Sequence, residues 1–342
     1  MAPSALAGFR DTGIGTDTVT YADFIFQRVA SSNGSFIEFL QAYGKDEFFG
    51  IEFGYALLNY VLSLFSDSVN WLYFFTNFAV IIFVYLTAYD NRKKAQMWMV
   101  MALYLLLFYN SSLNIMRQSI AVAMALYAFK YIENRQWFKS LLWLVIIYLT
   151  HSSGIFFAIF LVIYKISFLK NRRASVWLQV LFLASTSLFF IAFSTVLNLL
   201  TVVSDNFSKY DELYSNEGKT VVVKNLILLY VIFLIIIFLL RKYVPKDQLR
   251  NTDFYMYLKI TGLIFFLTSI ISVTTSRVSW YINVLDCIII PRMLYEFSKK
   301  GGRVTELIAI IVVLLALGIW YWNIAFLNAA ETYPYKSSIL GL

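Results

Sequence analysis

Cysteine and histidine are almost absent from this 342-residue chain, which contains one of each. The single cysteine, Cys287, excludes a disulfide within the chain. The single histidine, His151, has no second histidine and no cysteine cluster with which to share a metal, and zinc sites need several such ligands. We therefore expect no metal site.

Charged residues are also scarce. They make up 14% of the chain, and apolar residues make up 60%. Soluble domains have about 25% charged and about 45–50% apolar residues. This composition indicates an integral membrane protein. The net charge of +8 does not indicate nucleic-acid binding, because the basic residues are sorted by loop.

Long apolar runs predict an all-α, polytopic membrane bundle of about ten spans. The predicted spans are 70–89, 95–110, 114–133, 138–150, 153–166, 174–200, 221–240, 254–274, 280–297 and 304–323. A further apolar segment, 51–66, is too short to span and is predicted to be a re-entrant or interfacial helix. We expect one membrane domain, 1–342, composed of an external segment 1–50, this short helix, the bundle 70–323 and an external tail 324–342.

Basic residues collect in alternate loops, which predicts the orientation of the chain. These loops hold 17 Lys and Arg against 5 Asp and Glu, and they are 90–94, 130–139, 165–173, 241–253 and 296–303. The positive-inside rule places them in the cytoplasm. Arg117, His151, Arg277 and the N-terminal segment then lie outside. No apolar run precedes that segment, so either a first helix is missing or another route carries it across.

Arg117 lies near the outer end of a predicted span. Asn114, Gln118 and Ala121 lie on one helix face with it, along which neighbours are three or four residues apart. Such a polar, small-residue face is typical of contact with protein or water, and ionisable groups at membrane depth usually serve a function. The alternative is an arginine that snorkels to the headgroups.

His151 lies at a break between two short apolar helices, beside Thr150 and Ser152. A break at membrane depth is tolerated where it is buried in protein or lines a cavity. Histidine titrates near neutral pH and suits a general base. The alternative is a satisfied structural histidine. The sequence has no nucleophile elbow, so it gives no support to a serine hydrolase.

The segment 8–21 has three glycines, which permit tight turns. Arg10 within it can bind phosphate with a two-pronged hydrogen bond, and Asp17 can cap a helix that starts near Thr18. A plain helix cap with solvated charges explains these residues as well. Asp286 lies within a predicted span and has no assignable partner.

Two external stretches complete the candidates. Arg277 is predicted in a short turn between two spans, with Tyr281 one helical turn further on. The tail carries Tyr333 and Tyr335, whose rings can stack on sugars or anchor at the membrane interface.

These residues, in this order, resemble the EpsG family of bacterial exopolysaccharide proteins, which are Wzy-like polymerases. The matching residues are Gly8-Phe-Arg10, Gly15-Thr-Asp17, Tyr21, Glu52, Arg117 with Ala121, His151-Ser-Ser153, Arg277 with Tyr281, Pro291 and Tyr333-Pro-Tyr335. The resemblance covers nearly the whole chain. The sequence departs from the family where a membrane helix usually precedes the first motif, and at Gly154, where the family often has alanine.

The resemblance implies a GT-C-like polymerase of exopolysaccharide, O-antigen or capsule that joins undecaprenyl-diphosphate-linked oligosaccharides at the outer face of the bacterial cytoplasmic membrane. Its cations would bind the diphosphate, and its aromatic and amide groups would bind the rest of the substrate. Those residues are Arg10, Arg117, Arg277, Gln118, Tyr21, Tyr281, Tyr333 and Tyr335. His151 is the expected base, with Glu52 and Asp17 as the alternatives. The lipid-linked donor requires no cofactor, and a flippase and a chain-length regulator are expected partners.

Three other functions stay open on sequence grounds. An O-antigen ligase uses similar donor chemistry with a different acceptor, and a membrane acyltransferase also uses a histidine. A flippase or transporter belongs to a different class and should show matched repeats or broken helices, which this sequence does not display.

Overall fold

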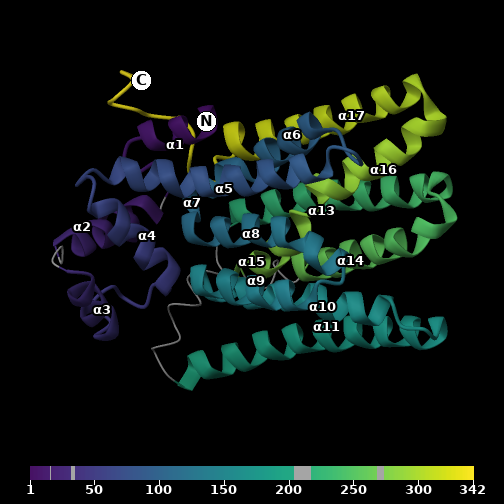
Figure 1. Cartoon of the computed structure of the whole chain (residues 1–342), viewed down its shortest axis with the longest axis horizontal. Helices are drawn as coiled ribbons and strands as arrows, with labels where there is room; N and C mark the ends of the chain where they lie inside the picture. The colour runs from purple at the N-terminus through teal and green to yellow at the C-terminus, as the bar shows by residue number, and fades with distance from the viewer. Residues whose placement is uncertain (16, 32–34, 204–216, 268–272) are drawn as a thin grey trace. The chain divides into compact units, whose positions relative to one another are not determined.

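The computed structural model describes residues 1–15, 17–31, 35–203, 217–267 and 273–342. Throughout these ranges every regular element is a helix (Figure 1). The prediction of an all-α architecture is therefore confirmed for the described chain.

Three described helical stretches are long and apolar enough to cross a membrane, judged by length and composition. They are Val69–Asn91, Lys224–Tyr243 and Arg303–Phe326. Three shorter apolar helices are Met97–Leu107, Trp137–Thr150 and Ser152–Ser167. Membrane character is thus supported, and the count of about ten spans stays a prediction.

The chain divides into two compact units, each described here by itself. Unit 1 comprises Met1–Asp90, Tyr104–Phe157 and Trp320–Leu342, and unit 2 comprises Asn91–Leu103 and Ala158–Ile319. The expectation of one membrane domain over 1–342 stays a prediction.

Unit 1 contains the N-terminal helices, the central pair of helices and the C-terminal tail. Its elements are α1 (Ala2–Phe9), η1 (Thr18–Ala22), α2 (Asp23–Ser31), α3 (Phe36–Gly44), α4 (Phe53–Ser63), α5 (Val69–Asn91), α7 (Tyr109–Asn114), α8 (Met116–Glu133), α9 (Trp137–Thr150), η2 (Ser152–Phe156) and η8 (Tyr321–Phe326). The predicted short helix at 51–66 corresponds to α4.

Helix α8 is the most buried element of unit 1. Its alanines 121, 123, 125 and 128 are all fully buried, and it packs along α9. Small side chains let two helices approach closely and exclude lipid from the contact. The small-residue face that the sequence indicated therefore faces protein.

The two ends of the chain are bound to each other by hydrogen bonds within unit 1. The N–H of Asp11 donates to the Lys336 carbonyl at 3.1 Å, and the N–H of Gly15 donates to the Glu331 carbonyl at 2.8 Å. The Asp11 carboxylate also accepts from the backbone N–H and the hydroxyl of Ser338. The N-terminal segment and the tail thus form one substructure.

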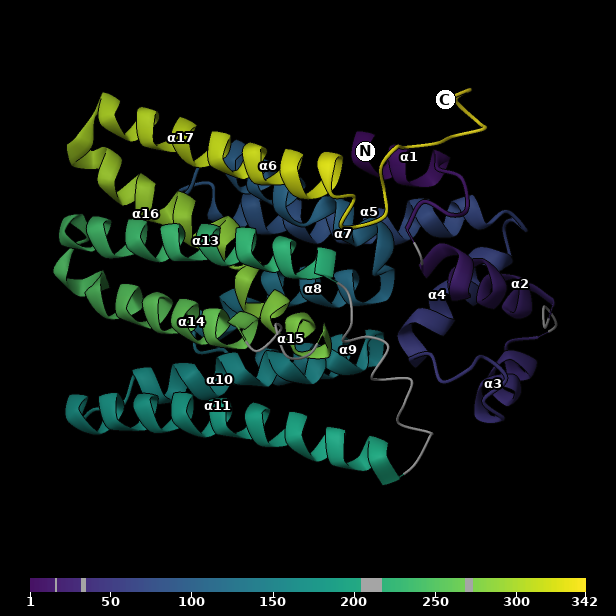
Figure 2. The ribbon, with the colours of Figure 1, turned by 180° about the vertical axis from the view of Figure 1, so that it is seen from behind.

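Unit 2 consists mainly of longer helices. They are α6 (Met97–Leu107, shared with unit 1), α10 (Phe157–Ser167), α11 (Arg172–Val203), α13 (Glu217–Leu240), η5 (Arg241–Tyr243), η6 (Lys246–Gln248), α14 (Leu249–Leu267), α15 (Val273–Asn283), α16 (Asp286–Gly301) and α17 (Arg303–Trp320). Helices α13 and α14 run side by side (Figure 2), and α14 also packs on α15.

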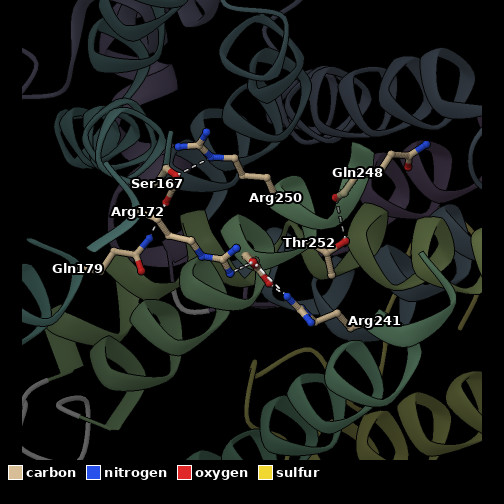
Figure 3. A network of polar contacts seen from close by, with 8 residues as sticks. Ser167, Arg172, Gln179, Arg241, Gln248, Arg250 and Thr252 are labelled. Carbon is tan, nitrogen blue, oxygen red and sulfur yellow. Dashed lines mark hydrogen bonds and ion pairs between the residues drawn. The ribbon is translucent and has the colours of Figure 1, made fainter. Parts of the chain in front are cut away.

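Two of the predicted basic loops meet in unit 2. Arg172 and Arg241 both donate to the Asp253 carboxylate, and Arg250 donates to the Ser167 carbonyl at 3.2 Å (Figure 3). Loops that share a polar network must lie on one side of the unit. This contact agrees with the common side that the positive-inside rule assigned to them.

One predicted turn is helical instead. Arg277 was expected in a turn and 280–297 in one span, but the backbone forms α15, which includes Arg277, and then α16 after a break at 284–285. Val273–Asn283 contains neither glycine nor proline, so nothing in it opposes a helix. Asp286 in the first turn of α16 favours a helix start, because a carboxylate complements the positive end of the helix dipole.

Candidate functional site

Arg117 and Glu52 form an ion pair in unit 1. Arg117 is the second residue of α8, and Glu52 directly precedes α4. The Arg117 Nη1 donates to the Glu52 Oε2 at 2.8 Å, and the side chains are 19% and 13% exposed. Arg117 therefore binds a protein carboxylate, and both groups remain within reach of solvent or ligand.

Glu52 also binds the break after α9. Its Oε1 accepts from the backbone N–H of Ser152 at 2.8 Å. This N–H belongs to the first turn of η2, where helical N–H groups have no partner in their own helix. One carboxylate thus joins the start of α8 to the break that carries His151.

His151 lies at that break with extended backbone, φ −156° and ψ 132°. Its Nδ1 accepts from the backbone N–H of Ser153 at 3.1 Å, and the Ser153 hydroxyl lies 2.7 Å from the same nitrogen. The imidazole therefore caps η2, as serine or aspartate does at other helix starts.

Two glycines make the close approach possible. A Cβ on Gly54 would lie 2.8 Å from the Leu149 carbonyl oxygen, and one on Gly154 would lie 2.6 Å from the Ile147 side chain and 2.7 Å from its backbone. Larger residues do not fit without a shift of α4 or η2. Gly154 thus lies at a contact that positions His151.

The local charges keep Glu52 ionised at neutral pH. Burial acts to raise its pKa, but the Ser152 N–H, His151 and Arg117 together hold the pKa below the ordinary glutamate value. Burial raises the pKa of Tyr43, and the negative charge of Glu52 raises it further. The cluster therefore contains a stable carboxylate beside a guanidinium and an imidazole.

Arg10 is buried in a shell of aromatic side chains. It is 1% exposed, its Nη2 donates to the Met116 Sδ at 3.3 Å, and its guanidinium lies 4.6 Å from the centre of the Tyr73 ring. Burial lowers its pKa to about 10, so it stays charged at neutral pH. Its Nε and Nη1 have no hydrogen-bond partner within the described part of the chain.

The remaining predicted residues of unit 1 have different environments. The Asp17 N–H donates to the Asn114 Oδ1 at 3.2 Å, and its side chain makes no capping bond to η1, contrary to the predicted cap. Gln118 is 2% exposed on α8. The Tyr335 hydroxyl donates to the Leu6 carbonyl, whereas the Tyr333 side chain is 53% exposed.

Three predicted binding residues belong to unit 2 or have side chains that the structure does not describe. Tyr281 is fully buried in α15 of unit 2. The backbone of Tyr21 belongs to η1 and that of Arg277 to α15, but their side chains lie outside the described residues. Their roles in binding stay predictions.

The sequence did not reveal several contributors. Ser152 and Ser153 act through backbone N–H groups, which carry no sequence signal. The role of Gly54 is recognisable only from its close contact with the Leu149 backbone. Asp286, whose partner the sequence left open, pairs with Lys259 of α14, and both side chains are 1% exposed.

Metal ligands do not cluster among the described residues, where no group of three His, Cys, Asp or Glu is positioned to hold an ion. The expectation that the protein uses neither metal nor cofactor stays a prediction.

An all-helical apolar chain with a charged Arg–Glu pair beside a histidine defines a membrane protein with a polar site. The model of the EpsG family matches residues 1–337, almost the entire chain. The chain therefore belongs to the EpsG family, a family of Wzy-like polymerases. Comparison with curated proteins and with solved structures gives no match, so the likeness to the GT-C fold stays a prediction.

Proposed function

We propose that this protein is a membrane glycosyltransferase that joins undecaprenyl-diphosphate-linked oligosaccharide repeat units at the outer face of the cytoplasmic membrane. Family membership supports the class of reaction. The observation that carries the site is the Glu52–Arg117 pair held against the His151 break. A flippase that supplies repeat units and a regulator of chain length are its proposed partners.

The proposed reaction needs one cation at the leaving group and one base at the acceptor. The acceptor hydroxyl oxygen bonds to the anomeric carbon of the donor sugar, and the bond from that carbon to the diphosphate oxygen breaks. The bonding electron pair leaves with undecaprenyl diphosphate, and the hydroxyl proton passes to the base. Arg117 can hold the diphosphate with two parallel hydrogen bonds, because its guanidinium matches phosphate geometry.

The first α8 turn adds to this anion preference. Its backbone N–H groups lack partners within the helix, and the helix dipole places partial positive charge there. Arg10 lies against Met116 at the same helix start. A diphosphate bound here would meet charge of the correct sign from side chain and backbone together.

The test is the lipid-linked glycan profile of a strain in which the gene is deleted. A polymerase defect leaves single repeat units on the lipid carrier outside the cytoplasm. Loss of a flippase leaves them inside, and loss of a ligase leaves finished polymer on the carrier. Either of the last two profiles would contradict the proposal.

Orientation is tested separately by cysteine labelling in intact cells. A cysteine at Ser35 should react with an impermeant thiol reagent, and a cysteine at Arg172, which is 82% exposed, should not. The reverse pattern would place the Arg117 cluster in the cytoplasm.

A further inference from the structure

The hydrogen bond from Ser153 to His151 determines which imidazole nitrogen carries the proton. A backbone N–H can only donate, so the Nδ1 that it meets at 3.1 Å must be an acceptor. In neutral histidine one ring nitrogen accepts and the other donates. The proton of neutral His151 therefore resides on Nε2.

This tautomer is incompatible with a general base. A base must present an unprotonated nitrogen to the proton that it removes. Nδ1 already accepts from the Ser153 N–H and lies 2.7 Å from the Ser153 hydroxyl, and Nε2 already carries hydrogen. The opposite tautomer would set an Nδ1–H against the Ser153 N–H.

The surrounding backbone keeps the ring in this role. The Gly154 N–H donates to the His151 carbonyl at 2.7 Å, and Gly154 lies so close to Ile147 that a Cβ would not fit. The turn that presents the Ser153 N–H to the ring is thus held by α9. A ring rotation would leave that N–H without its acceptor.

Glu52 has the properties that His151 lacks. An ionised carboxylate is only an acceptor and offers about four lone-pair positions on its two oxygens. Ser152 and Arg117 each occupy one such position at 2.8 Å. A further position on the same carboxylate can take a proton from an acceptor hydroxyl.

We propose that Glu52 is the base that deprotonates the acceptor hydroxyl, and that His151 donates its Nε2–H to an anionic oxygen of the lipid-linked diphosphate. The proposal rests on the polymerase function proposed above. It departs from the sequence-based expectation that His151 is the base. The acceptor proton passes to the Glu52 carboxylate and then to water, while the electron pair of the broken bond stays on the diphosphate.

Arg117 links donor binding to the strength of the base. While paired with Glu52, the guanidinium stabilises the carboxylate and weakens it as a base. A diphosphate that attracts the same guanidinium reduces that stabilisation, so the proton affinity of Glu52 rises. Glu52 is then the strongest base when the donor is in place.

Several charged or titratable groups lie around Glu52 and would contribute to a pH dependence measured at this site. Arg117 faces it from α8, His151 from the end of α9, and Tyr43 from α3. On α2, which packs on α4, Asp23 accepts from Gln27 and Arg28 donates to the Glu47 carbonyl. Among these described groups, histidine is the residue type whose reference pKa lies near neutrality.

The single histidine permits a direct test of the tautomer. Full-length protein labelled with ¹⁵N-histidine and purified with a histidine-free tag in lipid nanodiscs gives signals from one imidazole. The expected spectrum at pH 7.5 shows Nε2 protonated and Nδ1 unprotonated. A proton on Nδ1, or imidazolium at that pH, would overturn the proposal, whatever reaction the protein catalyses.

Two substitutions separate the two nitrogens of His151. His151→Gln places an amide N–H near the position of Nε2 and cannot take a proton, and His151→Asn retains an acceptor near Nδ1 but lacks the distant donor. We expect the Gln variant to polymerise lipid-linked repeat units within about tenfold of wild type and the Asn variant to lose more. Glu52→Gln should lose about 10²–10⁴-fold in turnover, the usual contribution of a base, with donor binding retained.

The pH profile of the wild-type protein identifies the base without any variant. A carboxylate whose pKa lies near or below the usual glutamate value of about 4.3 stays ionised and can act as a base through pH 5 to 8, whereas a histidine base would lose about tenfold in rate per pH unit below about pH 6.5. We expect no such loss between pH 7 and 5.5. A rate that follows the histidine pattern, with the Gln variant as inactive as Glu52→Gln, would overturn the base assignment alone. A wild type that polymerises no repeat units would overturn the proposed function as well.

Discussion

Two ion pairs with little exposure to solvent, one in each unit, differ in every respect that matters for ligand binding. Arg117 and Glu52 in unit 1 are 19% and 13% exposed, lie at the starts of helices, and have a backbone N–H as a third member. Lys259 and Asp286 in unit 2 are both 1% exposed, and the Lys259 ammonium lies 3.9 Å from the centre of the Tyr230 ring. The Lys259–Asp286 pair, which we call the closed pair, can only stabilise its own fold. The partly exposed Arg117–Glu52 pair, which we call the open pair, can exchange partners with a ligand.

The largest expected effect comes from breaking the closed pair. Lys259→Met leaves Asp286 buried without its cation, which typically destabilises a protein by about 3–5 kcal/mol. We expect little folded protein by fluorescence-detected size-exclusion chromatography. The double variant Lys259→Met/Asp286→Leu removes both charges and should recover most of it. Equal loss in the single and double variants would contradict a purely structural pair.

The open pair should affect activity rather than folding. Arg117→Lys retains the charge but loses the two-pronged hydrogen bond to phosphate, so we expect polymerisation to fall on the order of 10–100-fold, as for the loss of one charged hydrogen bond. Protein level and melting temperature should stay near wild type. Arg172→Lys, at an 82% exposed arginine, is the matched control. Full activity of Arg117→Lys would show that Arg117 does not bind the donor.

A closely packed glycine beside the open pair should affect both stability and activity, because it sets the position of Glu52. Gly54→Ala places a methyl group 2.8 Å from the Leu149 carbonyl oxygen, and overpacking of this kind costs about 1–3 kcal/mol. Relief by movement of α4 would carry Glu52 away from Ser152. We expect a lower melting temperature and slower polymerisation, whereas Gly44→Ala, where a Cβ meets nothing within 4 Å, should change neither.

Arg10 is as buried as Lys259, yet among the described residues the groups that interact with it are Met116 and tyrosines rather than a carboxylate. Arg10→Met removes a desolvated charge and retains a flexible apolar side chain. We expect melting temperature to stay within a few degrees of wild type, in contrast to Lys259→Met. If Arg10 receives the diphosphate, polymerisation falls in this variant, and unchanged activity would limit Arg10 to packing.

The smallest expected effect concerns the Ser153 hydroxyl. Ser153→Ala removes the hydroxyl at 2.7 Å from the His151 Nδ1 but keeps the backbone N–H that fixes the tautomer. We expect less than about a tenfold change in polymerisation, in line with a net worth of about 1 kcal/mol for a hydrogen bond. A loss as large as that of Glu52→Gln would assign the hydroxyl itself a catalytic role.

The fold class was predictable because long apolar runs and scarce charge leave few alternatives to membrane helices. The candidates Arg117, His151 and Glu52 were predictable because ionisable residues beside apolar runs are conspicuous. Helix boundaries at 115 and 284–285 were less visible, since neither break contains glycine or proline. The deep burial of Arg10 was not visible either, because the tyrosines of its shell come from distant segments.

The sequence alone determined that this chain is apolar, helical and sparing in histidine, cysteine and charge. Those properties depend on composition and on spacing along the chain. Only the tertiary structure decided that Glu52 meets both Arg117 and the Ser152 N–H, and that the Nδ1 of His151 accepts rather than donates. The physical reason is that a hydrogen bond depends on the position and direction of two atoms, and here backbone groups, which are the same in every sequence, decide what the side chains can do.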